Sequence, residues 1–151
     1  MQHPDTLRLR IIIDVEPEKV WKALTKSEYI QYYFHGCEVE SAWQENDAIA
    51  FNLEMEGQKK TLVHGKLLEI EKNKVLRHSL FPSDAKYPDI PANHIVVCYE
   101  LIDLAGQTEL IITQTGFQNA QDGEKRFEES IKGWDYSLPL LKEISESIPN
   151  L

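Results

Sequence analysis

The chain is poor in cysteine, in basic clusters and in long apolar runs, and each shortage argues against a class of protein. Its 151 residues include two cysteines, Cys37 and Cys98, which lack a Cys-x-x-Cys spacing, so we do not expect a disulfide framework. No apolar run approaches the roughly eighteen residues that a membrane-spanning helix needs. The formal net charge is −9 and no basic run is present, which argues against nucleic acid and anionic membrane surfaces as partners.

Signatures of catalysis and of metal binding are also scarce. The sequence has no glycine-rich phosphate loop, no Gly-x-Ser-x-Gly elbow and no His-Glu-x-x-His helix. Its five histidines are scattered, and His35 with Cys37 is the only close His/Cys pair, whereas a zinc site needs three or four converging ligands. We therefore expect no metal and no cofactor.

The first ten residues carry no signal-peptide pattern, in which a charged segment precedes an apolar one. We therefore expect a cytoplasmic protein. A chain of this length can bury roughly two thirds of its unfolded surface, and we expect one domain over residues 1–151.

The longest regular pattern is at the carboxyl-terminal end, over residues 122–148. Its apolar residues recur at helical spacing and predict one buried stripe, made of Phe127, Ile131, Trp134, Leu138, Leu141 and Ile148. Gly133 and Pro139 interrupt this pattern. They predict either a helix bent between residues 135 and 139 or two shorter helices broken at Ser137.

The rest of the chain predicts one strand, two short helices and then six strands. Alternation of apolar residues predicts a strand over residues 6–13, and Pro17 opens a helix over 17–24. Thr25 and Glu28 have the spacing of a capping box, which predicts a second short helix ending near Phe34. The remaining strands are expected at 37–43, 48–55, 59–70, 75–81, 94–103 and 108–115, with a proline-containing loop at 82–92. This order predicts an α+β fold, in which the long helix lies in the hollow of an antiparallel sheet.

Several short segments, in this order and spacing, resemble the family named after the activator of the heat-shock protein 90 ATPase. That family belongs to the START-like, Bet v 1-like helix-grip superfamily (SRPBCC). The segments are Val20–Thr25, Trp43 with Ile49 and Phe51, Gly65–Ile70, Thr108–Ile112, Gly116 with Phe117, and Gly133–Trp134 followed by Leu138, Leu141 and Ile144.

The resemblance implies a seven-stranded antiparallel curved sheet that grips the long C-terminal helix, with two short helices and a cavity between them. Members of the superfamily include carriers of lipids and hormones, cyclases and co-chaperones, so fold alone does not specify chemistry. Leu80 and Gln114 stand where the family often has Trp and His, at positions expected to face the cavity. The resemblance therefore implies the fold and the cavity but no particular ligand.

Strand alternation places three polar side chains among the inward-facing apolar ones. If Leu76 and Leu80 point toward the helix, so does His78, and the same parity turns Tyr99 and Gln114 inward. A few polar groups in an apolar chamber are typical of a small-ligand site. Alternatively, the three side chains bond one another or trapped water and bind nothing.

Further residues are expected to border this cavity. Aromatic side chains near it are Tyr32, Tyr33, Phe34, Phe81, Phe117 and Trp134, and the apolar ligand contacts are Leu80, Leu110, Ile112 and Leu138. The opposite face of the same strands is more apolar than a monomer needs and suggests a dimer or partner patch, made of Val96, Cys98, Ile102 and Ile111 beside Glu100, Glu109 and Thr113.

Three functions fit these observations. The first is a non-enzymatic protein that binds a small hydrophobic or amphipathic molecule between the helix and the sheet. The second is a co-chaperone-like regulator of a heat-shock protein 90-type ATPase, as the resemblance implies. The third is an enzyme of cyclase or hydrolase type that uses His78 and Tyr99, although no inward carboxylate is predicted to orient the histidine.

Overall fold

The fold was taken from a computed structural model that describes residues 5–150. A strand, β1 (Leu7–Ile13), comes first and is followed by the helices α1 (Pro17–Thr25) and α2 (Ser27–Tyr33). The next elements are β2 (Glu38–Ser41), β3 (Ala48–Met55), β4 (Gln58–Glu71), β5 (Val75–Pro82), a 3₁₀ turn η1 (Pro91–Asn93), β6 (Ile95–Asp103), β7 (Thr108–Thr115) and α3 (Gly123–Ser147).

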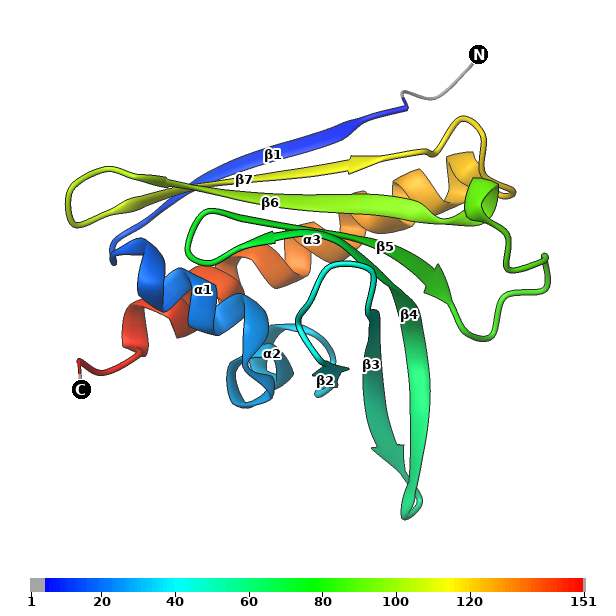
Figure 1. Cartoon of the computed structure of the whole chain (residues 1–151), viewed down its shortest axis with the longest axis horizontal. Helices are drawn as coiled ribbons and strands as arrows, with labels where there is room; N and C mark the ends of the chain where they lie inside the picture. The colour runs from blue at the N-terminus through cyan, green and yellow to red at the C-terminus, as the bar shows by residue number, and fades with distance from the viewer. Residues whose placement is uncertain (1–4, 151) are drawn as a thin grey trace.

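The seven strands form one antiparallel sheet in the order β1-β7-β6-β5-β4-β3-β2. Strands β2 to β7 follow one another as a meander, and β7 ends this meander beside β1, with Leu7 opposite Gln114 and Ile13 opposite Thr108. Helix α3 crosses one face of this sheet, and α1 and α2 lie beside its carboxyl-terminal half (Figure 1). The predicted α+β helix-grip fold is thereby confirmed.

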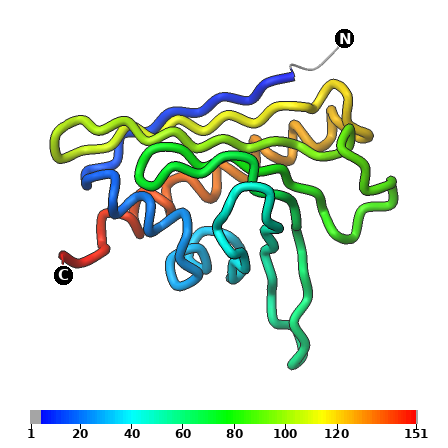
Figure 2. The backbone as a smooth tube through the Cα atoms, in the orientation of Figure 1, coloured from blue at the N-terminus to red at the C-terminus, as the bar shows by residue number. Residues whose placement is uncertain are grey.

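Two irregularities in the ladder interrupt the sheet where β3, β4 and β5 meet. The register shifts between Phe51 and Asn52 on β3, and again between Leu67 and Glu69 on β4. Such bulges bend a strand and increase its twist. The hairpin of β3 and β4 extends away from the other strands (Figure 2).

Strand β2 ends before the predicted residue 43 because the backbone at Trp43 is not extended. Trp43 has a φ of 60°, in the left-handed region that an extended strand does not use. The strand therefore ends at Ser41. The other strand predictions agree with the structure to within one residue at each end.

Helix α3 is one continuous helix, and the alternative of two helices broken at Ser137 is wrong. Pro139 lies inside it. The predicted stripe is correct except at Ile131, which is 37% exposed. Small residues share the inner face with the apolar ones: Ser130 and Ser137 are half-buried, and Ser145 is fully buried.

The predicted capping box is wrong. Helix α2 begins after Lys26 and has no side-chain capping hydrogen bond. The hydroxyl of Thr25 instead donates to the carbonyl of Trp21, one turn back in α1. Ser27 uses its hydroxyl to hold β2, since it accepts from the Val39 amide at 2.9 Å and donates to the Val39 carbonyl. Both hydroxyls are therefore engaged outside the cap.

The main core lies between the sheet and the three helices. Its fully buried members come from every layer and include Ile13, Val20, Leu67, Leu110 and Leu141. None of the helices within residues 5–150 combines the length and apolar character that crossing a membrane requires.

Candidate functional site: a cavity between helix and sheet

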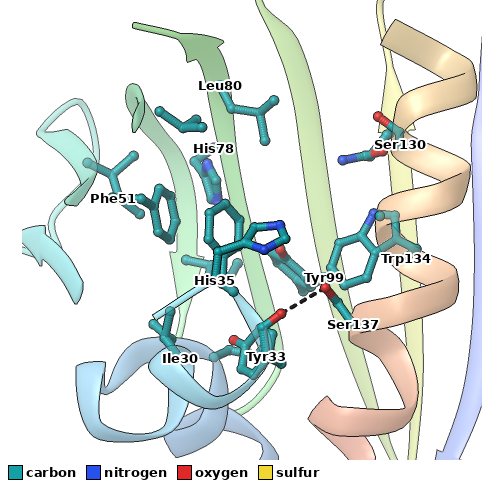
Figure 3. A pocket seen from close by; sticks show the side chains of 17 residues that line it. Ile30, Tyr33, His35, Phe51, His78, Leu80, Tyr99, Ser130, Trp134 and Ser137 are labelled. Atoms are coloured by element: carbon teal, nitrogen blue, oxygen red, sulfur yellow. Dashed lines mark hydrogen bonds between the residues drawn. The ribbon is translucent and has the colours of Figure 1, made fainter. Parts of the chain in front are cut away.

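A cavity of about 150 Å³ lies between α3, α2 and the inner face of the sheet. In Figure 3, Phe51 and His78 face Trp134 and Ser130 across it, and Ile30 and Tyr33 lie on the α2 side. The lining consists of Leu24, Ile30, Tyr33, Phe34, His35, Ile49, Phe51, Val63, Leu76, His78, Leu80, Tyr99, Gln114, Ser130, Gly133, Trp134 and Ser137.

Strand alternation brings the three predicted polar residues to this cavity. On β5, His78 lies between Leu76 and Leu80, and all three side chains line the wall. His78 is opposite Val97, which is opposite Gln114, so His78 and Gln114 are two strands apart in one row, about 10 Å between backbones. The Tyr99 ring lies 6.2 Å from the His78 ring, centroid to centroid. No hydrogen bond joins the three within residues 5–150.

Seven of the predicted ligand contacts line the cavity and four do not. The seven are Tyr33, Phe34, His78, Leu80, Tyr99, Gln114 and Trp134. Leu110 and Ile112 have the expected parity, but they are fully covered by neighbouring core side chains. Phe117 packs edge-to-face on Phe127 in a separate small cluster, and Leu138 packs against the main core.

Two aromatic residues expected at the cavity border lie elsewhere. Tyr32 is 43% exposed, and its hydroxyl donates to Glu143 on α3 at 2.7 Å. Phe81 is buried at the end of β5, where its ring stacks on His94 and meets Tyr87 edge-on. Each residue thus stabilises a contact between elements outside the cavity.

Sequence reasoning missed the small residues of α3 that leave room for the cavity. Ser130, Gly133 and Ser137 line it at spacings of three and four, on the same face as Trp134. Larger side chains at these positions would fill the space. The pattern was visible in the sequence, because small residues three and four positions apart lie on one face of a helix and leave space beside that face. Ser137 also ties α3 to α2, since its hydroxyl donates to the Tyr33 carbonyl at 2.8 Å.

No Asp, Glu, Lys or Arg side chain belongs to the lining of the cavity. Burial lowers the pKa of His78 from 6.5 to about 4, so its imidazole is uncharged at neutral pH. The ring nitrogen Nδ1 lies 2.9 Å from the carbonyl oxygen of Ser79. Because a carbonyl only accepts, Nδ1 carries the proton and donates, which leaves Nε2 as a bare acceptor.

Two tyrosines of the cavity lining are also uncharged. Burial raises the pKa of both Tyr33 and Tyr99 above the ordinary value of 10.0, so both phenols keep their protons. The Tyr33 hydroxyl donates to the Ala23 carbonyl at 2.8 Å and is therefore engaged. The carbonyl oxygen Oε1 of Gln114 is buried and has no hydrogen-bond partner within residues 5–150. An unpaired buried acceptor is costly, so a partner for it would stabilise the protein.

A second polar cluster lies at the other end of the sheet, where the loop after β5 returns to β6. Asp89 accepts from both imidazoles that flank it, at 2.8 Å from His64 Nε2 and 2.5 Å from His94 Nε2. The opposite nitrogens of these rings meet the hydroxyls of Ser83 and Ser79, at 2.9 and 3.1 Å. These hydrogen bonds hold the pKa of Asp89 below its usual range. The cluster fastens the loop to the sheet, and sequence reasoning missed it because the two histidines are 30 residues apart.

No group of three or more His, Cys, Asp or Glu side chains within residues 5–150 is arranged to hold a metal ion. The expected Cys37 and Cys98 thiols are both free, and Cys37 is buried, which raises its pKa. The lining of the cavity presents apolar side chains and a few hydrogen-bonding groups.

Similarity to solved structures agrees with this architecture. A protein from Cytophaga hutchinsonii is 29% identical, with a TM-score of 0.72 and 97% of each chain covered. An HSP90 activator from Plasmodium falciparum is 18% identical, with a TM-score of 0.71, covering 93% of this chain and 96% of that one. The Aha1 dimer from Colwellia psychrerythraea is 17% identical, with a TM-score of 0.69 and coverage of 94% and 96%. The last two are similar in fold alone. No curated protein matches the chain.

The family model described as Activator of Hsp90 ATPase homolog 1-like protein matches residues 14–146. That match runs from the end of β1 to the last turn of α3, and it therefore includes every element that lines the cavity. The chain belongs to the family of Activator of Hsp90 ATPase homolog 1-like proteins.

Proposed function

We propose that this protein binds a small, mostly apolar molecule in the cavity between α3 and the sheet, without converting it. The observation that carries the proposal is an apolar chamber in which the Gln114 carbonyl oxygen is buried and has no partner within residues 5–150. A molecule that fills the space removes apolar surface from water and can form hydrogen bonds with the polar groups of the lining. The cytoplasmic location expected from the sequence is part of this proposal.

The test is native mass spectrometry of the purified protein, followed by thermal shift measurements with lipids, flavonoids and small aromatic compounds. We expect a retained adduct or a rise in melting temperature with at least one class, because a ligand that binds only the folded state stabilises it. The absence of both an adduct and a shift with every class would refute the proposal.

A cavity-filling variant makes the test specific to this site. Ser130 is half-buried, lines the cavity and has no side-chain hydrogen bond within the described chain, so Ser130→Phe places a ring in the space. The matched control is Lys132→Phe, which adds the same ring to an exposed position of the same helix. We expect Ser130→Phe to abolish the shift and Lys132→Phe to keep it. Circular dichroism of both variants checks that the fold is retained.

Regulation of a heat-shock protein 90-type ATPase is the second candidate. Membership of the family supports it, together with fold similarity to the HSP90 activator from Plasmodium falciparum. The assay is ATP hydrolysis by a purified heat-shock protein 90 with and without this protein. A concentration-dependent rise in rate supports regulation, and an unchanged rate at saturating protein argues against it.

A homodimer contact belongs to the same candidate, because a dimer is reported for the Colwellia protein. In the apolar patch predicted on the outer face of the sheet, Ile102 is exposed whereas Ile111 is buried. The exposed apolar area of the patch is therefore smaller than the sequence predicted. Sedimentation at high concentration distinguishes a dimer from a monomer.

Catalysis by His78 and Tyr99 has weaker support. A general base works best with a pKa near the working pH, and the His78 pKa of about 4 makes its imidazole a weak base. Its Nδ1 partner is the Ser79 carbonyl and not a carboxylate. We therefore do not assign turnover to this pair.

A further inference from the structure

We propose that the cavity takes a neutral molecule the size of one aromatic ring that carries a hydroxyl group, such as a phenol, and that the hydroxyl donates to His78 Nε2. This inference rests on the proposed binding function and names the class of ligand. Four features of the cavity lead to it: its volume, the absence of charge, its aromatic walls and the fixed polarity of His78.

The volume sets the size of the ligand. A cavity of about 150 Å³ lies between the helix and the sheet, and an apolar space of roughly that volume accommodates a benzene molecule. A flavonoid or a fatty acid is larger than this space and would extend beyond it. A single-ring compound fits with the elements where they are.

The lining sets the charge. Its 17 residues include no Asp, Glu, Lys or Arg, and His78 is uncharged at neutral pH. Removing a carboxylate or an ammonium group from water without an opposite charge is strongly unfavourable. The part of the ligand that reaches His78 must therefore be neutral, which argues against benzoate-like acids and against amines.

The walls favour a flat aromatic ring. Phe34 and Phe51 are stacked at 5.0 Å, and the Phe51 and His78 rings are 5.8 Å apart. On the opposite side, Tyr99 meets Trp134 nearly edge-on at 6.2 Å. Aromatic rings attract one another in stacked and edge-to-face arrangements, so these two walls offer contacts that an aliphatic ligand uses less well.

His78 determines that the ligand must donate a hydrogen bond. His78 is 1% exposed, and its Nδ1 is engaged by the Ser79 carbonyl, so Nε2 presents a lone pair and no proton. A ligand hydroxyl satisfies this acceptor, whereas an ether or ketone oxygen does not. The Tyr99 hydroxyl and the Gln114 amide adapt to either polarity, which makes His78 the group that selects for a donor.

The experiment measures dissociation constants by isothermal titration calorimetry at pH 7 for phenol, toluene and benzoate. Phenol and toluene have nearly the same shape and differ in the donor, and benzoate adds a negative charge. Each is titrated into wild type, His78→Phe and His78→Gln. His78→Phe keeps a ring and removes the acceptor, whereas His78→Gln restores an acceptor. His64→Gln is the control, because His64 lies outside the cavity lining.

We expect phenol and toluene to bind and benzoate not to bind. We expect His78→Phe to weaken phenol binding by about threefold or more relative to toluene, the effect of losing one buried hydrogen bond. His78→Gln recovers part of that loss, and His64→Gln leaves the ratio unchanged. Toluene binding to each variant also reports that the cavity is intact.

The outcomes separate this inference from the proposed function. If toluene and phenol bind wild type and His78→Phe with the same ratio, or if benzoate binds as tightly as phenol, the inference is wrong and the binding function stands. If only lipids or flavonoids bind, the size argument is wrong. If no compound of any class binds, both fail. The wild-type comparison of phenol with benzoate does not depend on either variant being folded.

Discussion

Acidification should destabilise this protein well above the pH at which its carboxylates titrate, and His78 is the cause. Burial lowers the pKa of this imidazole from 6.5 to about 4 in the folded protein, whereas the unfolded chain has the ordinary value. Below pH 6.5 the unfolded state takes up a proton that the folded state does not, so the free energy of unfolding falls as the pH falls. The loss is complete near pH 4, where the folded state also protonates.

The size of the effect follows from the difference between the two pKa values. At about 1.4 kcal/mol for each pH unit, a pKa difference between 6.5 and about 4 corresponds to roughly 3 kcal/mol. His78 is 1% exposed, so solvent does not screen the effect. Between pH 7.5 and pH 5, before the carboxylates contribute strongly, the expected loss is roughly 2 kcal/mol.

Urea unfolding followed by circular dichroism, at intervals of half a pH unit from 7.5 to 5, measures this loss. The comparison is with His78→Gln, which keeps a donor for the Ser79 carbonyl and does not titrate. The other histidines are present in both proteins, so the difference between the two profiles isolates His78. Parallel profiles for wild type and His78→Gln would refute the argument, because they would mean that position 78 binds a proton equally in both states.

Three further predictions concern single substitutions measured by urea unfolding. Gly133→Ala should raise the free energy of unfolding by about 1 kcal/mol, because alanine favours the helix and its Cβ meets no atom within 4 Å; a decrease would show that the glycine is needed for packing. Gly65→Ala should lower it by about 1–3 kcal/mol, because the added Cβ collides with the backbone carbonyl of Ser79 on the neighbouring strand; an unchanged midpoint would contradict that close approach. Asp89→Asn should lower it by less than about 1 kcal/mol, since the carboxylate is half-exposed, while hydrogen exchange of the amides in residues 83–94 becomes faster. Because the pKa of Asp89 is lowered, its contribution to stability is present above the ordinary carboxyl pKa of 3.8 and is lost as the pH falls through the lower pKa of the folded state. Hydrogen exchange that is equally slow in Asp89→Asn would mean that the loop does not depend on this residue.

The predicted elements were largely correct because their signals are local. Helix α3 and strand β1 were predicted from periodicity, since one buried face imposes a period on the sequence. The errors arose where another interaction competed with the local one. Thr25 had the spacing of a cap, but its hydroxyl bonds back to Trp21, and Trp43 ended β2 through a left-handed backbone.

The predictions for the candidate site were also correct where the signal is local and wrong where other elements decide the outcome. Parity predicted that His78, Tyr99 and Gln114 face one side of the sheet, and all three line the cavity. Parity also placed Leu110 and Ile112 on that side, yet neighbouring side chains cover them completely. Which inward-facing residue meets a cavity and which meets a packed core depends on the volumes of side chains from other elements, and no single strand carries that information.

The sequence by itself determined the order of elements, the face that each strand and the long helix buries, and a composition without a basic surface or a long apolar span. Only the tertiary structure decided that the space opposite Trp134 stays open, because Ser130, Gly133 and Ser137 leave too little bulk to fill it. It alone placed His78 deep enough to remain uncharged and turned its Nδ1 toward the Ser79 carbonyl. Both outcomes depend on desolvation and packing, which arise only when segments distant in the chain come together.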